Sequence, residues 1–171
     1  MWPWTEIADW AWARHHNELS WYIRPLIMLA FCAAAWWRNL IGVIGLALFF
    51  PLSAVVFPAP ATPKAYVVDF LAKERAMLDA LTPLGWLVFV GAVVVFLWLL
   101  AAAFWKHSFW YGLAVANLGG ATKLFVSIFL WNDIGNTAIL PTLTTAFVFN
   151  CAAIMMWRWL RKTHGSSTGK T

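Results

Sequence analysis

Apolar residues run along most of this chain in long blocks that polar residues interrupt only briefly. An α-helix needs about 20 consecutive apolar residues to cross the hydrocarbon core of a bilayer. Two blocks near the lower limit, residues 21–37 and 40–57, are separated by Arg38 and Asn39, and this pattern predicts a helical hairpin. Because both blocks are short, a re-entrant pair that turns back within the bilayer is the alternative.

Three further apolar blocks, residues 84–105, 109–131 and 138–157, follow a proline-rich connector at residues 58–63. Proline cannot continue a helix, so the connector separates the hairpin from the rest of the chain. Lys106, His107 and Ser108 predict a tight turn between the first two of these blocks, and residues 132–136 predict a turn before the last. The sequence therefore predicts an all-α integral membrane bundle of about five transmembrane helices.

Two segments have a different pattern, which predicts interfacial helices. In residues 64–81 apolar positions recur every three to four residues beside a charged side, as in an amphipathic helix on a membrane surface. Residues 1–20 mix four tryptophans with charges, and tryptophan favours headgroup depth. We expect an interfacial segment at 1–20, a single bundle at 21–160 that includes the surface helix, and a mobile basic tail at 161–171. Residues 1–20 lack the pattern of a signal peptide, so we expect them to stay attached.

Composition supports the membrane assignment, because 63% of the residues are hydrophobic and only 11% are charged. No ordinary soluble domain has that balance. The net charge of +5 would suggest nucleic acid as a partner of a soluble protein, but here basic residues lie at the ends of apolar blocks, so we expect no nucleic-acid binding. Cys32 and Cys151 lie inside apolar blocks without CxxC spacing and are interpreted as small core residues.

Five spans would divide the charges between two sides of the membrane, with Lys123 set aside. Basic residues tend to face the cytoplasm, and those that directly flank spans count most. We therefore expect an outside amino terminus and a cytoplasmic carboxyl terminus. The cytoplasmic side then holds only basic residues, Arg38, Lys106, Arg158, Arg161, Lys162 and Lys170, whereas the outer side holds Arg14, Arg24, Lys64, Lys73 and Arg75 with all seven acids.

Lys123 lies inside the apolar block 109–131, where an ammonium group is costly unless it finds a partner or water. At about 100° per residue, a stripe of small residues falls within roughly 60° of it on the helix. Such a stripe lets another helix approach closely, which predicts that this block is the central packing helix. The stripe comprises Gly112, Ala116, Gly119 and Gly120.

Three interpretations of Lys123 remain open from the sequence. It pairs with an acid reaching in from the outer side, it lines a hydrated route, or it contacts a partner subunit or lipid headgroup. Neighbouring amide and hydroxyl groups can bond across helices in all three cases, and Arg24 can snorkel. The candidate polar intramembrane site comprises Lys123, Asn117, Thr122, Asn150 and Arg24, with Glu18, Glu74 and Asp133 as possible acidic partners.

His15 and His16 are a candidate metal site, because imidazole suits zinc and related ions. Adjacent residues of a helix point about 100° apart, however, so interfacial hydrogen bonding is the favoured interpretation. No predicted span contains a histidine that could ligate a haem, and we expect no cofactor. The sequence also lacks a catalytic pair, a phosphate-binding glycine loop and a serine elbow, so we do not expect an enzyme.

The run from His15 to Leu26, the Phe57-Pro58-Ala59-Pro60 segment and the charged surface helix after it together resemble a family of small bacterial inner-membrane proteins without an assigned function. The resemblance covers most of the chain. It implies a location and an arrangement of spans, and it implies no role for any residue.

The leading hypothesis is a noncatalytic accessory or binding protein of a bacterial inner membrane, rich in tryptophan, that contacts a larger membrane complex or lipids. Its partners would be membrane lipids and either another protein or further copies of itself. The alternative is a small oligomeric transporter or channel with a polar site around Lys123, although the sequence lacks an inverted repeat. A membrane enzyme acting on lipid is the third hypothesis.

Overall fold

The computed structural model describes residues 3–129 and 132–165, and within them the chain forms seven α-helices and no strand. The predicted all-α class is confirmed. Two helices of this described part, α2 (Leu19–Trp36) and α5 (Pro83–Trp105), are long and apolar enough to cross a membrane, and the apolar stretch Leu40–Val55 is shorter. A bundle of five transmembrane helices is therefore not confirmed.

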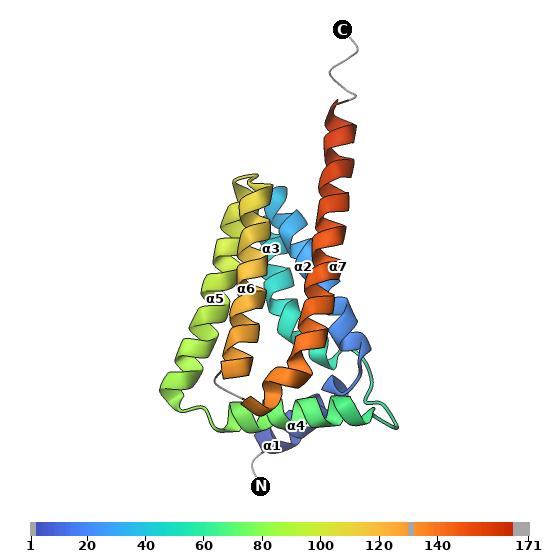
Figure 1. The fold of residues 1–171 in the computed structure, drawn as a ribbon, viewed down its shortest axis with the longest axis vertical. Helices are drawn as coiled ribbons and strands as arrows, with labels where there is room; N and C mark the ends of the chain where they lie inside the picture. Colours follow the sequence, from blue (N-terminus) through green and yellow to red (C-terminus); the bar gives the residue numbers. More distant parts are fainter. Residues whose placement is uncertain (1–2, 130–131, 166–171) are drawn as a thin grey trace.

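Most of the helices lie along the long axis of the molecule, and the others lie across one end (Figure 1). The long helices are α2, α3, α5, α6 and α7; the amino-terminal helix α1 and the helix α4 cross the end at which α2 begins. The bounds are α1 Pro3–His15, α2 Leu19–Trp36, α3 Leu40–Leu52 with the 3-10 turn η1 Ser53–Val55, α4 Ala65–Asp79, α5 Pro83–Trp105, α6 Phe109–Phe129 and α7 Asn132–Gly165.

Two tight turns close the opposite end of the bundle, as the polar interruptions of the sequence predict. Arg38 and His107 follow α2 and α5 with φ angles of 55° and 57°, a left-handed conformation that ends a helix. The Asn39 side chain accepts a hydrogen bond from the Gly42 amide at 2.9 Å and so caps α3. Arg38 Nε donates to the Trp105 carbonyl at 3.4 Å, which ties the two turns together.

The structure differs from the predicted boundaries at three places. α3 stops at Leu52, next to Pro51, and the chain continues only as η1. Proline disrupts the hydrogen bonding of a helix, so Pro51 explains this early end. Residues 132–136, predicted as a turn, are instead the first residues of α7. Asn132 and Asp133 are residue types that favour the start of a helix as well as a turn. α7 also extends to Gly165, so residues 161–165 of the predicted tail are helical, and 166–171 lie outside the described residues.

The core lies in the half of the bundle near the two turns. Phe104 and Phe109, on either side of the α5–α6 turn, pack edge to face at 6.4 Å, and the Phe109 ring stacks on Trp157 of α7 at 5.1 Å. They belong to one apolar cluster whose buried members come from four helices, α2, α5, α6 and α7. Its buried members are Phe31, Cys32, Ala35, Leu100, Phe104, Phe109, Leu113, Phe149 and Ala153.

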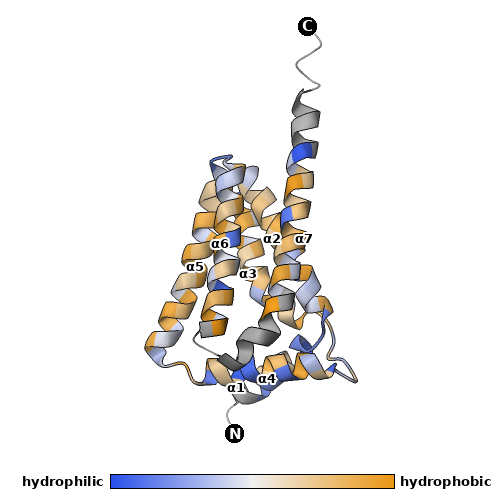
Figure 2. Cartoon of the chain, in the orientation of Figure 1, coloured by the Kyte–Doolittle hydropathy of each residue, from blue (hydrophilic) through white to orange (hydrophobic). Residues whose placement is uncertain are grey.

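Helix α5 contributes few residues to this core and exposes most of its length. Only 17% of its most apolar window is buried. Figure 2 shows α5 as a largely apolar helix at the side of the bundle. Hydrophilic residues gather at the two ends of the molecule. The exposed large side chains of α5 include Leu87, Val88, Val90, Val94 and Trp98.

Candidate functional site

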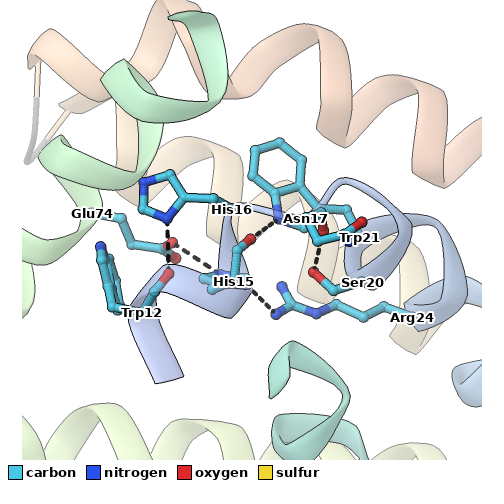
Figure 3. Close-up of polar contacts among 8 residues, drawn as sticks. All are labelled: Trp12, His15, His16, Asn17, Ser20, Trp21, Arg24 and Glu74. Atoms are coloured by element: carbon cyan, nitrogen blue, oxygen red, sulfur yellow. Dashed lines mark hydrogen bonds and ion pairs between the residues drawn. The ribbon is translucent and has the colours of Figure 1, made fainter. Parts of the chain in front are cut away.

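A polar cluster lies at the end of the bundle that α1 and α4 cross, and it joins three helices (Figure 3). His15 ends α1, Arg24 lies in α2 and Glu74 lies in α4. Arg24 Nη2 is 3.3 Å from His15 Nδ1, and His15 Nε2 is 3.8 Å from Glu74 Oε2. Because arginine can only donate, Nδ1 accepts this hydrogen bond, and Nε2 is the ring nitrogen that faces Glu74.

The elbow between α1 and α2 brings His15 toward Arg24, and Asn17 forms that elbow. Its backbone nitrogen donates to the Arg14 carbonyl at 3.0 Å, and its side-chain oxygen accepts from the Leu19 backbone nitrogen at 3.0 Å. The side-chain nitrogen donates to the Pro58 carbonyl at 3.0 Å. Asn17 therefore fixes both the elbow and the connector that leads to α4.

Aromatic rings cover His15, which is 7% exposed. The Trp12 ring meets the imidazole edge to face at 5.7 Å, and Trp21 Nε1 donates to the His15 carbonyl at 3.2 Å. Water is thus largely excluded from one side of the cluster, which strengthens the electrostatic interactions inside it.

Glu74 is the acid of this cluster, and Lys123 of α6 acts on it. Burial raises the pKa of Glu74, but the contact with His15 and the charges of Lys123 and Arg24 outweigh burial and hold the pKa below its ordinary value. Arg24 Nε is buried and makes no hydrogen bond with the described residues. In this cluster His15 thus contacts the Glu74 carboxylate, while Arg24 and Lys123 act on it through their charges.

Of the three predicted acidic partners of Lys123, the structure places Glu74 within its electrostatic reach. Glu18 is engaged elsewhere, because Lys64 Nζ lies 2.8 Å from its Oε2 and the Tyr66 hydroxyl donates to its other oxygen. The hydrogen bond and charge of Glu18 raise the pKa of Lys64. The side chain of Asp133 lies outside the described residues. Glu18 therefore anchors the start of α4, while Glu74 serves the cluster.

Asn117 and Asn150 form a separate pair between α6 and α7. Each side-chain nitrogen donates to the other side-chain oxygen at 2.9 Å. Each also donates to a carbonyl of its own helix, Asn117 to Leu113 at 2.8 Å and Asn150 to Ala146 at 2.7 Å. Every amide hydrogen of the two side chains is therefore used.

The structure thus does not assemble the five predicted polar residues into one site. Asn117 and Asn150 form their own pair, and Arg24 belongs to the cluster under α4. Lys123 and Thr122 are exposed on α6, and Lys123 is linked to the cluster through Glu74.

The predicted small-residue stripe of α6 faces α5 in part. A methyl group at Gly112 would lie 2.5 Å from a carbon of the Phe104 ring, and one at Gly119 would overlap Phe96, whereas Gly120 has nothing within 4 Å. Ala116 packs against the core cluster. Gly112 and Gly119 therefore allow the close approach of α5, and Gly120 does not take part.

The two histidines face different partners. His16 Nδ1 lies 2.8 Å from the Trp12 carbonyl, whereas His15 faces Arg24 and Glu74. Among the described residues, no group of three or more histidine, cysteine or acidic side chains is arranged to hold a metal ion.

Ser20 Oγ, drawn beside His15 in Figure 3, donates to the Asn17 carbonyl at 2.7 Å, so its hydrogen is engaged by the backbone.

Sequence reasoning named His15, Arg24 and Glu74, but for three different reasons, and it did not predict that they meet. No local signal could have joined them, because they come from three helices and the connector determines how α4 returns over α1. Comparison of the chain with protein-family models, with curated proteins and with solved structures finds no match. The case for a function therefore rests on geometry.

Proposed function

We propose that the chain is a noncatalytic integral protein of a bacterial inner membrane that acts as an accessory or binding protein toward a larger membrane complex or lipids. The observation that carries this proposal is the surface of α5. A helix of 23 residues with 17% of its apolar window buried is not the core helix of a soluble protein, which would be covered by other helices. Exposed apolar surface of this extent marks contact with a membrane or a partner.

We further propose that α2, α3, α5, α6 and α7 all cross the membrane. These five helices run alongside one another, and the charged helices α1 and α4 lie across one end (Figures 1 and 2). Arg38, Lys106 and Arg158 flank the other end, which we assign to the cytoplasm. A lysine inside a span needs an opposite charge nearby. The Glu74 carboxylate of α4, which we place at the membrane interface, supplies that charge to Lys123.

The polar groups support a binding role over a catalytic one. In the cluster, His15 lies between Arg24 and Glu74, and the Asn117–Asn150 pair satisfies itself. These contacts hold helices together: the first ties α1 and α4 to the bundle, and the second ties α6 to α7. What they leave free for a partner is the apolar and aromatic surface of the bundle.

The test is to crosslink the full chain in native membranes, purify it in a gentle detergent and weigh the intact assembly by native mass spectrometry. We expect a fixed stoichiometry with another protein, with further copies or with retained lipid. Recovery only as a bare monomer would contradict the proposal. Extraction of the chain from membranes by alkaline carbonate would contradict the membrane assignment itself.

A small oligomeric transporter or channel is the second candidate, and the exposure of polar side chains on α6 favours it. Lys123, Thr122 and Asn117 are all exposed in the single chain, and an oligomer could enclose them. In that case Lys123→Met would abolish solute or ion flux into proteoliposomes while folding and assembly stay intact. Lys106→Met, the same change in the α5–α6 turn, is the matched control. Absence of flux from the unaltered protein would favour the accessory role.

A further inference from the structure

We infer that the proposed cytoplasmic end of the bundle holds a specific site for one anionic phospholipid, between α2 and α7. This inference rests on the membrane location proposed above and names a ligand for the chain. It comes from a cavity and a set of basic residues that the cluster under α4 does not include.

An apolar cavity of about 70 Å³ opens between the last turns of α2 and the α7 segment that faces them. It is lined by Cys32, Ala33 and Trp36 of α2, by Trp37 directly after that helix, by Met156 and Trp157 of α7, and by Phe104 and Phe109. Trp37 is 70% exposed, whereas Phe104 and Phe109 are 3% and 5% exposed. The cavity thus leads inward from an exposed ring to buried rings, which suits part of an acyl chain.

Basic residues follow directly on the residues that line this cavity. Arg38 comes after Trp37, Arg158 comes after Trp157, and Lys106 lies in the short turn that joins Phe104 to Phe109. All three basic side chains are exposed. The left-handed turn at Arg38 and its bond from Nε to the Trp105 carbonyl hold the arginine at this end, and no described residue bonds to its terminal nitrogens.

The charge at this end selects the type of lipid. The acidic residues of the described part lie in α1, in α4, at the elbow (Glu18) and at the start of α7 (Asp133), all at the opposite end of the molecule (Figure 1). Arginine and lysine bind phosphate oxygens well. A zwitterionic headgroup would bring an ammonium group to a rim that has no described carboxylate to receive it. An anionic headgroup with its phosphate between Arg38 and Arg158 fits the rim better, and basic pockets at this depth take such lipids.

The test is a titration of the full-length protein in detergent with phosphatidylglycerol or phosphatidylethanolamine, read by native mass spectrometry and by the thermal shift on binding. We expect one phosphatidylglycerol to be retained in preference to phosphatidylethanolamine. Arg38→Gln and Arg158→Gln should each weaken that retention about fivefold, whereas Arg38→Lys should keep most of it because the charge remains. Ala33→Leu, which fills the cavity without changing charge, should also weaken it.

Lys73→Gln is the matched control, because it removes a basic charge from α4 at the other end. Equal binding of the two lipids, or an equal loss of phosphatidylglycerol in Lys73→Gln and Arg158→Gln, would overturn the inference. The thermal unfolding of each variant is first measured without added lipid. If Ala33→Leu does not fold, lipid retention by Arg38→Gln and Arg158→Gln tests the site. A chain that stays in carbonate-washed membranes but shows no preference refutes this site alone. A chain that leaves those membranes refutes the proposed function.

Discussion

Glu74 is the residue on which the charge balance at the α1–α4 end depends, since His15, Arg24 and Lys123 all act on it. Glu74→Gln keeps the shape of the side chain but leaves these basic groups without their carboxylate. Removing one partner from a largely buried polar group costs about 1–3 kcal/mol. We expect that loss in the free energy of unfolding, measured by denaturant or thermal unfolding in one detergent.

Asp79→Asn is the matched control on the same helix. Its carboxylate is 75% exposed and lies 4.0 Å from Arg75 Nε, and an exposed pair of this kind contributes little. We expect a change within about 0.5 kcal/mol. Equal losses in the two variants would show that Glu74 has no special place in the fold.

The same carboxylate predicts how stability depends on acid. The pKa of Glu74 is lowered in the folded state from an ordinary value of 4.5. Its contribution is therefore fully present above that ordinary value and is lost as the pH falls through the lowered pKa. We expect the melting temperature of the unaltered protein to fall more steeply than that of Glu74→Gln between about pH 5 and pH 3. Parallel curves would mean that other groups cause the acid sensitivity.

Among the helices, α6 is the element whose packing is easiest to test, because its glycines differ in what surrounds them. A Cβ atom at Gly112 would meet the ring of Phe104, which is 3% exposed and has little room to move. We expect Gly112→Ala to destabilise the protein by about 1–3 kcal/mol. Gly119→Ala should cost less, because Phe96 is only partly buried.

Gly120→Ala supplies the internal control, since nothing lies within 4 Å of the added methyl group. Alanine favours a helix over glycine by up to about 1 kcal/mol, so this change should be neutral or stabilising. Thermal unfolding of the three variants in one detergent gives the order. If Gly120→Ala lowers stability as much as Gly112→Ala does, another molecule must pack against this face of α6, and the expectation for Gly120 is wrong.

The Asn117–Asn150 pair predicts a measurable coupling between α6 and α7. Between helices that cross a membrane, as we propose for α6 and α7, hydrogen bonds contribute about 0.6 kcal/mol on average and up to about 1.7 kcal/mol. Asn117→Leu and Asn150→Leu should each cost about this much or more, because the remaining amide loses two of its contacts. The double variant should cost less than the sum, and a double-mutant cycle of unfolding free energies measures the difference. Additive losses would show that the amides do not interact.

Over the whole molecule, local patterns predicted the elements well and their assembly poorly. Arg38-Asn39 and Lys106-His107-Ser108 interrupt apolar blocks sharply, and the structure turns at both places. The turn predicted at residues 132–136 is wrong, because the residue types there favour the start of a helix as well as a turn, and α7 starts there. The cluster of His15, Arg24 and Glu74 depends on how α4 folds back over α1, and no periodicity within one helix encodes that.

The last prediction concerns orientation, which follows from the distribution of charge along the whole chain. Ala61 and Ser108 are exposed and lie at opposite ends, one in the connector before α4 and one in the α5–α6 turn. With Cys32 and Cys151 replaced by alanine, Ala61→Cys should react with a membrane-impermeant maleimide in intact cells. Ser108→Cys should react only after the cells are permeabilised, because Arg38 and Lys106 flank the end that we propose to be cytoplasmic. The reverse pattern would invert the assignment, and labelling of both sites in intact cells would refute an arrangement in which α5 crosses the membrane.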